Sequence, residues 1–399
     1  MADPLAFLDQ GWAELSAAGL ARVDVSIESA QGPTVVRGGH ALLNLTSNDY
    51  LSLAAHPAVR EAAAAAARRF GAGAGASRLL GGDLPIHREL EAELAALKGT
   101  EDAVVFPSGY HANTGIIPAL VDEGDAVFSD ALNHASIVDG CRLSRARREV
   151  YRHADAEHLE ALLSRTPARR RLIVTDTLFS MDGDVAPLVQ LCELAERHGA
   201  ILMVDEAHAT GIYGGGAGLC AEVGVAGRVP VQMGTLGKAL GSAGAYVAGS
   251  RRLTRWLRTC CRSYVFTTAL SPPACGAALA ATRLVRAPEG RALREGLLDR
   301  ARRFAVALRA RDLRVLGGSH HLLGIVVGDP EPAMEASRRL ESLGIFARAV
   351  RPPTVPEGTS RLRLSVCAGH EPAALLSAAE LVADALRAAL EGARRRVGT

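Results

Sequence analysis

The chain has 399 residues, 48% of them hydrophobic, and a formal net charge of +2 at pH 7. This length is enough for one large domain and a smaller one, and so small a net charge gives no reason to expect a nucleic-acid partner. The seven cysteines are scattered without a CxxC pair, which argues against a disulfide framework and a structural metal site and for a reducing compartment. Without a signal-like N-terminus or an apolar run long enough to cross a bilayer, we expect a cytoplasmic protein.

The hydrophobic pattern predicts a helix over 3–19 and then a strand-like stretch, PTVVRGGHALLNL. Between about 57 and 290, short apolar runs alternate with helical patterns, which predicts βαβ units and a parallel or mixed sheet with helices on both faces. Such a sheet carries its chemistry at the carboxyl ends of its strands. The predicted strands are 102–106, 125–130, 170–176, 200–206 and 244–249, and the predicted helices are 87–98, 110–120, 134–145, 155–165 and 187–199.

After about 290 the pattern changes to that of a smaller α+β domain. A long helix is predicted over 289–311, strands near 322–327 and 361–366, and further helices at 331–343 and 371–393. We therefore expect an N-terminal segment (1–50), a large domain (51–288) and a small C-terminal domain (289–399).

Only two of the 45 Lys and Arg residues are lysines, Lys98 and Lys238. Lysine can form a Schiff base and can lose its proton, and arginine can do neither. Lys98 ends a predicted helix before a glycine, where a cation suits the helix dipole and arginine would serve as well. Lys238 lies in the apolar segment VQMGTLGKALGSAGAYVAG, where partial desolvation would lower its pKa and prepare the amine as a nucleophile.

The strand end at Asp205 continues as DEAH, which is also a signature of one class of helicases. That interpretation requires an upstream GxxxxGK[ST] phosphate loop, and the sequence has none. The Gly-Lys at Lys238 follows DEAH, with Ala239 where Ser or Thr is needed and Gln232 where the first Gly is needed. The nucleotide-driven motor is excluded.

A pyridoxal 5'-phosphate (PLP) site explains the same residues better. PLP needs a lysine for covalent attachment, a carboxylate for its pyridine nitrogen, donors for its phenolic oxygen and a phosphate cradle. Asp205 fits the pyridine nitrogen, and His208 and Ser180 fit the phenolic oxygen.

Two further groups of residues complete the expected site. Ser108, Gly109 and Tyr110 open a predicted helix after a strand, where backbone N–H groups favour a phosphate, and Thr235 adds a hydroxyl. His134 follows another strand end and is placed to stack on the ring. The glycine-rich stretch 71–82 fits either a mobile loop or a close backbone approach.

Seven motifs in this chain resemble those of the α-oxoamine synthases, PLP enzymes of fold type I. The resemblance runs from about residue 20 to 390, and its motifs read SNDYLSL, FPSGYHAN, DALNHASIVDG, DTLFSMDGDVAPL, VDEAHATG, GTLGKALGSAGAYVAG and RPPTVPEGTSRLRLS. The resemblance implies a large domain with a mostly parallel seven-stranded sheet, and a homodimer with its site at the subunit interface. It also implies a decarboxylating condensation of an amino acid with an acyl thioester on CoA or a carrier protein.

Family roles carried onto matching positions agree with the assignments above. They make Lys238, Asp205 and His134 catalytic, with Lys238 bound to PLP, and they place substrate contacts at Arg22, Asn48, His134, Thr354 and Arg363. In these roles Arg363 binds the amino-acid carboxylate and Lys238 moves the Cα proton. Thr267 or Thr268 would reach the neighbouring subunit's phosphate. Two positions depart from the family: Ser52 replaces a usual glycine, and Tyr110 stands where phenylalanine is also common.

The motifs are most similar to the subfamily that joins L-alanine to a pimeloyl thioester. A relative that joins glycine or serine to another acyl-CoA is the alternative, because pocket shape sets that selectivity. A catalytically silent protein of this fold would lack the lysine or the carboxylate, and both are present.

Overall fold

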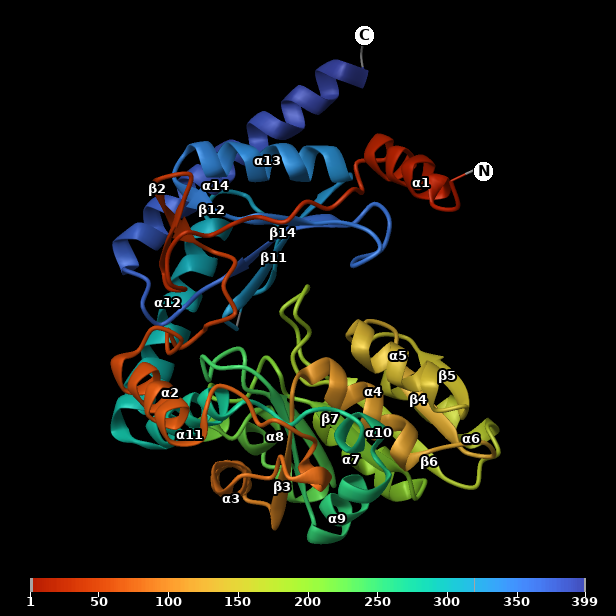
Figure 1. Cartoon of the computed structure of the whole chain (residues 1–399). Coiled ribbons are helices and arrows are strands. Elements are labelled where there is room, and N and C mark those ends of the chain that lie inside the picture. Colours follow the sequence, from red (N-terminus) through yellow and green to blue (C-terminus); the bar gives the residue numbers. More distant parts are fainter. Residues whose placement is uncertain (1–2, 319, 398–399) are drawn as a thin grey trace. The chain divides into compact units, whose positions relative to one another are not determined.

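The computed structural model describes residues 3–318 and 320–397, apart from the side chains of 396 and 397 (Figure 1). Contacts divide the chain into two units. The large unit comprises 48–180 and 184–296, and the small unit comprises 1–47, 181–183 and 297–399. The N-terminal 47 residues therefore group with the C-terminal part of the chain.

A seven-stranded sheet forms the centre of the large unit. Every neighbouring pair is parallel except those made by β9, which runs antiparallel to both of its neighbours. This confirms the predicted α/β class and the mostly parallel sheet. The strand order is β3 (Asp102–Phe106), β9 (Ala245–Gly249), β8 (Val231–Thr235), β7 (Ile201–Asp205), β6 (Arg171–Asp176), β4 (Ala126–Asp130) and β5 (Arg147–Tyr151).

Five of these strands match the predicted ranges to within one residue at each end, and β5 and β8 were not predicted. β5 begins with two arginines and is largely exposed at the sheet edge, so it lacks an apolar run. β8 reads VQMGT and is buried, but its Gln and Gly interrupt the pattern that marks a central strand. Both segments form strands because they pair with neighbouring strands of the sheet.

Helices surround this sheet within the large unit (Figure 1). Side chains of β3, β7, β8 and β9 share one buried apolar cluster with α4 and α5. The helices are α2 (Pro57–Phe70), α3 (Pro85–Lys98), α4 (Gly109–Leu120), α5 (Ala135–Leu143), α6 (Ala156–Arg165), α7 (Leu188–Arg197), α8 (Leu219–Glu222), α9 (Arg251–Cys260), α10 (Arg262–Val265), α11 (Pro272–Arg286) and the start of α12 (Pro288–Arg309).

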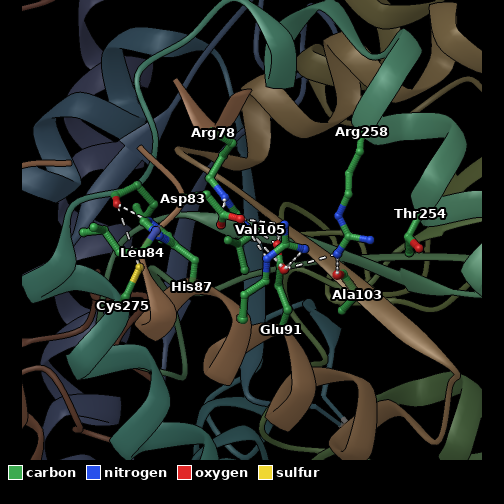
Figure 2. Close-up of polar contacts among 12 residues, drawn as sticks. Arg78, Asp83, Leu84, His87, Glu91, Ala103, Val105, Thr254, Arg258 and Cys275 are labelled. Atoms are coloured by element: carbon green, nitrogen blue, oxygen red, sulfur yellow. Dashed lines mark hydrogen bonds and ion pairs between the residues drawn. The ribbon is translucent and has the colours of Figure 1, made fainter. Parts of the chain in front are cut away.

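The glycine-rich stretch 71–82 is anchored by one buried arginine. Arg78 donates through both terminal nitrogens to Glu91, at 2.9 and 3.2 Å, and through Nε to Asp83 at 2.7 Å. Figure 2 shows Arg258 converging on the same Glu91, to which it donates at 3.2 Å. The structure therefore ties this loop to α3 and α9 by a two-arginine network around one carboxylate.

The small unit holds two sheets. β1 (Thr34–Arg37) and β2 (His40–Asn44) form a hairpin that β12 (Ile345–Phe346) extends. The second sheet has the order β10 (Val315–Gly317), β11 (Leu322–Gly328), β14 (Ser360–Ser365), β13 (Arg348–Val350) and is antiparallel.

The helices of the small unit are the rest of α12, from residue 297, and α1 (Ala6–Ala17), α13 (Pro330–Ser342) and α14 (Pro372–Val397), with α13 packed on α14. α1 confirms the predicted N-terminal helix, but it buries none of its residues. Within 3–318 and 320–397, no helix combines the length and the apolar character needed to cross a bilayer. All seven cysteines are free thiols.

Candidate active site in the large unit

Lys238 follows the end of β8 by three residues, and its side chain contacts His208. Lys238 Nζ is 2.9 Å from His208 Nε2, and His208 Nδ1 is 2.7 Å from the Tyr50 hydroxyl. The Tyr50 hydroxyl donates to Asn48 Oδ1 at 2.9 Å, so its oxygen accepts from Nδ1–H. This leaves Nε2 as the acceptor for the lysine. The chain of hydrogen bonds therefore aims a neutral imidazole at the reactive amine.

Asp205 ends β7 as a buried carboxylate held by two neutral donors. Its Oδ2 accepts from Asn113 Nδ2 at 2.8 Å, and its Oδ1 accepts from the backbone N–H of Ala207 at 2.8 Å. The residue is only 4% exposed. Hydrogen bonds to the charged form stabilise a buried carboxylate without neutralising it, as a partner for a ring N–H requires.

Asn113 and Asp176 also belong to this site, although neither was among the residues predicted from the sequence. Asn113 Nδ2 also lies 3.0 Å from Ser136 Oγ, and Ser136 Oγ is 2.7 Å from His134 Nδ1. Asn113 is part of the motif FPSGYHAN and Asp176 is part of DTLFSMDGD, so both residues lie in motifs that the sequence had already indicated as functional. Only the fold shows that Asn113, on α4, reaches across to the end of β7.

His134 and Asp176 are coupled through the backbone. The N–H of His134 donates to Asp176 Oδ2 at 2.8 Å, and Asp176 pairs in register with Asp205. Burial, reinforced by the Asp205 charge, raises the pKa of Asp176 well above its usual range. Although His134 is solvent-exposed, protein atoms desolvate its imidazole and lower its pKa, with Asp205 opposing and Lys238 assisting that shift. A neutral imidazole is suited to stack on a ring and to accept or donate one hydrogen bond.

The N-terminus of α4 forms an anion cradle beside Thr235. Ser108 caps the helix, and its Oγ accepts from the backbone N–H of His111 at 3.2 Å. A Cβ on Gly109 would lie 2.8 Å from Thr235 Cγ2, so this close approach requires glycine. The first N–H groups of a helix have no intrahelical acceptor and attract a phosphate. Together with a lysine and a buried carboxylate, this cradle fits a phosphorylated pyridine cofactor.

Tyr110 and Ser180, two further residues of the predicted cofactor site, differ in their exposure to solvent. Tyr110 is exposed and its hydroxyl donates to Asp139 Oδ2 on α5. Ser180 is half-buried, one residue after Phe179, in the loop that follows β6.

His153 fixes that loop from the end of β5. Its Nδ1 donates to Asp130 Oδ1 at 2.9 Å and its Nε2 to Asp184 Oδ2 at 2.7 Å, while its ring packs edge-on against Phe179. Burial lowers the pKa of His153, but the hydrogen bonds to Asp130 and Asp184 outweigh it and raise the pKa to about 10. A charged imidazolium therefore bridges two carboxylates beside the segment that carries Ser180.

The expected substrate residues are divided between the two units. Asn48 belongs to the large unit and bonds Tyr50, as described above, whereas Arg22, Thr354 and Arg363 belong to the small unit. Arg22 Nη2 donates to Thr354 Oγ1 at 3.0 Å across 332 positions of sequence. Arg363 is half-buried on β14. The structure brings Arg22 and Thr354 together, and the substrate roles of all four residues stay predictions.

Thr267 and Thr268 lie just after α10, Thr267 half-buried and Thr268 exposed. Their expected contact with a neighbouring subunit also stays a prediction.

Comparison with known proteins identifies the family. The model of the aminotransferase class I and II family matches residues 40–382. The chain belongs to this family. It is 57% identical over 360 residues to the 8-amino-7-oxononanoate synthase of Anaeromyxobacter dehalogenans (strain 2CP-1 / ATCC BAA-258), covering 90% of each chain. It is also 53% identical over 396 residues to the synthase of the same name from Anaeromyxobacter sp. (strain Fw109-5), covering 99% of this chain and 97% of that one.

Solved structures agree on the fold. A serine palmitoyltransferase from S. paucimobilis with a bound PLP–myriocin aldimine superposes with a TM-score of 0.91 at 32% identity, covering 97% of this chain and 99% of that one. An 8-amino-7-oxononanoate synthase from Francisella tularensis gives 0.73 at 25% identity, covering 87% and 98%. The fold type I class and the resemblance to the α-oxoamine synthases are thereby confirmed.

Proposed function

We propose that this chain is a PLP-dependent acyltransferase that condenses L-alanine with a pimeloyl thioester to 8-amino-7-oxononanoate, releasing the thiol and carbon dioxide, in biotin biosynthesis. The observation that carries the proposal is the Lys238–His208 contact beside the buried Asp205, in a chain 57% identical to proteins named for this reaction. The L-alanine and pimeloyl specificity rests on those names.

The cofactor would be held by residues of the large unit. Lys238 would bind it covalently, Asp205 would keep the pyridine nitrogen protonated, and His134 would pack on the ring. Ser180 and His208 would lie against the phenolic oxygen, and the start of α4 with Thr235 would bind the phosphate, through Ser108, Gly109 and Tyr110. When bound, PLP supplies an electron sink for the carbanion at the amino-acid Cα.

Proton transfer falls to Lys238. Once released from covalent attachment, its Nζ removes the Cα proton of the amino acid, and the 2.9 Å contact with His208 keeps the amine in place. His134 donates to the oxygen of the acyl group as charge develops on it. Arg363 binds the amino-acid carboxylate with two parallel hydrogen bonds, and Asn48, Arg22 and Thr354 contact the substrates.

The assembly and compartment follow from the same proposal. The active form is a homodimer, as the resemblance to the α-oxoamine synthases implies, in which Thr267 or Thr268 reaches the partner's phosphate. Seven free thiols suit the reducing cytoplasm.

A substrate panel tests the proposed reaction. The purified protein, loaded with PLP, is offered L-alanine, glycine or L-serine with pimeloyl-, acetyl-, succinyl- or palmitoyl-CoA, and thiol release is followed with a thiol-reactive dye. We expect the highest kcat/KM for L-alanine with pimeloyl-CoA, and a ketone product of the matching mass. Preference for glycine with acetyl-CoA, or for L-serine with palmitoyl-CoA, would reassign the chain within its family. A protein that binds no PLP would refute the proposal altogether.

A further inference from the structure

Lys98, the second lysine of the chain, is buried in an ion pair directly behind the site. It is the last residue of α3, and its side chain is 1% exposed, against 0% for its partner Glu206. The ammonium donates to Glu206 Oε2 and to the backbone carbonyl of Ala217. The sequence suggested a structural helix-end cation for which arginine would serve as well, and the structure shows that this cation is enclosed.

Glu206 is the residue next to Asp205, and strand geometry separates the two carboxylates. Successive side chains at a strand end point to opposite faces of the sheet. Asp205 accordingly meets Asn113 on one face, while Glu206 meets Lys98 on the other and accepts from the backbone N–H of Cys220 at 2.9 Å.

The backbone of Glu206 organises the turn that carries His208. Its carbonyl accepts the N–H groups of Ala209 at 2.9 Å and Thr210 at 2.8 Å, and its own N–H donates to Met233 of β8 at 2.8 Å. His208 lies inside that turn with its Nε2 on Lys238. A displacement of Glu206 therefore moves the groups on both sides of it, Asp205 and His208.

The carboxylate of Glu206 is closely packed on the side of Gly218. A Cβ at Gly218 would lie 2.3–2.5 Å from the carboxylate atoms of Glu206. The planar guanidinium of arginine is larger and presents its donors in a fixed fork, whereas an ammonium donates in three directions from one small atom. Burial alone would lower the pKa of Lys98, but the Glu206 charge outweighs it and the pKa is raised. Lys98 is therefore charged at neutral pH.

We propose that Lys98 is a positioning residue that acts through Glu206 to hold Asp205 and His208 in the geometry required by PLP, and that arginine cannot replace it. Removing the ammonium leaves a buried carboxylate without its counter-ion. That carboxylate either becomes protonated or moves toward water, and the turn that contains His208 moves with it. The inference rests on the proposed function for the identity of the cofactor.

The test compares Lys98→Met and Lys98→Arg with the wild type. Apoprotein is titrated with PLP and followed by visible absorbance, which gives a dissociation constant, and by visible circular dichroism, which reports the asymmetry around the bound cofactor. We expect Lys98→Met to weaken PLP binding at least about tenfold, to change the dichroism band and to lower kcat more than KM. Lys98→Arg should resemble Lys98→Met.

Arg258→Met is the matched control, because Arg258 is also a partly buried cation paired with carboxylates. Its partners are Glu91 (Figure 2) and Asp102, which are not part of this turn. It should lower resistance to urea while leaving PLP affinity within about twofold and the dichroism unchanged. If Lys98→Met yields no folded protein, Glu206→Gln carries the test, since it keeps the shape and removes the charge, and at least threefold weaker PLP binding is expected.

Wild-type PLP affinity and dichroism in Lys98→Met, or in Glu206→Gln where that variant carries the test, would overturn the inference. Full rescue by Lys98→Arg would overturn its lysine-specific part. A wild-type protein that binds no PLP at all would instead mean that the proposed function has failed, so the two failures are distinguishable.

Discussion

The two faces of the β7 end use the same pair of residue types, a lysine and a carboxylate, for opposite purposes. On one face, Lys238 is half-buried and contacts a neutral imidazole, and Asp205 is held by neutral amide donors. On the other face, Lys98 and Glu206 neutralise each other in a closed pocket. A charge that must react is kept near polar but uncharged groups, whereas a charge that must hold its place is paired and buried.

Replacing the reactive lysine should have the largest effect. Lys238→Ala should lower turnover at least about a thousandfold, because Lys98, the other lysine of the sequence, is buried against Glu206. The free energy of unfolding of the apoprotein should change by less than about 1 kcal/mol, since the side chain is half-buried. Steady-state thiol release and urea unfolding measure the two quantities. Normal turnover in Lys238→Ala would contradict the different roles assigned to the two lysines. The control is Arg283→Ala, at an exposed position on α11, which should leave turnover and the free energy of unfolding unchanged.

Removing the charge of His153 should have an intermediate effect, and the effect should depend on pH. Its pKa is raised to about 10 in the folded protein, above the value of about 6.5 in an unfolded chain. The stability it contributes is therefore complete below about pH 6.5 and is lost as the pH rises through about 10.

His153→Gln should accordingly lower the free energy of unfolding by about 1–2 kcal/mol at neutral pH, and the difference from wild type should shrink toward pH 10. Urea unfolding at a series of pH values measures it. His40→Gln, at an exposed position on β2, should give no such trend. A difference that is constant across this range would show that His153 acts by shape alone.

The smallest effect is expected at Ser52, where the chain departs from its family. Its φ is 57°, in the left-handed region that glycine adopts without strain. Ser52→Gly should be more stable than Ser52→Ala by about 1 kcal/mol, and because both variants lack the hydroxyl, their difference isolates the backbone. Equal unfolding free energies for the two variants would show that the turn relaxes around a side chain.

Much of the large unit followed from pattern alone. Five central strands were predicted because each is a short apolar run between helical segments, and the site residues at their ends follow from the rule that parallel strands share one chemical edge. β5 and β8 were not predicted. β5 is an exposed edge strand and β8 contains an internal glycine, so neither has a short continuous apolar run. The role of Asn113 was not predicted, because the sequence of a helix does not indicate which strand end a side-chain amide will contact.

By itself, the sequence determined that one of only two lysines lies in an apolar segment near a strand-end carboxylate, and its motifs determined the family. The tertiary structure decided the task of the other lysine. Whether an ammonium at a helix end faces water or a buried carboxylate depends on what packs against that helix, and Glu206 lies 108 residues away in the chain. Periodicity records which face of an element is buried, but not which charged groups meet there.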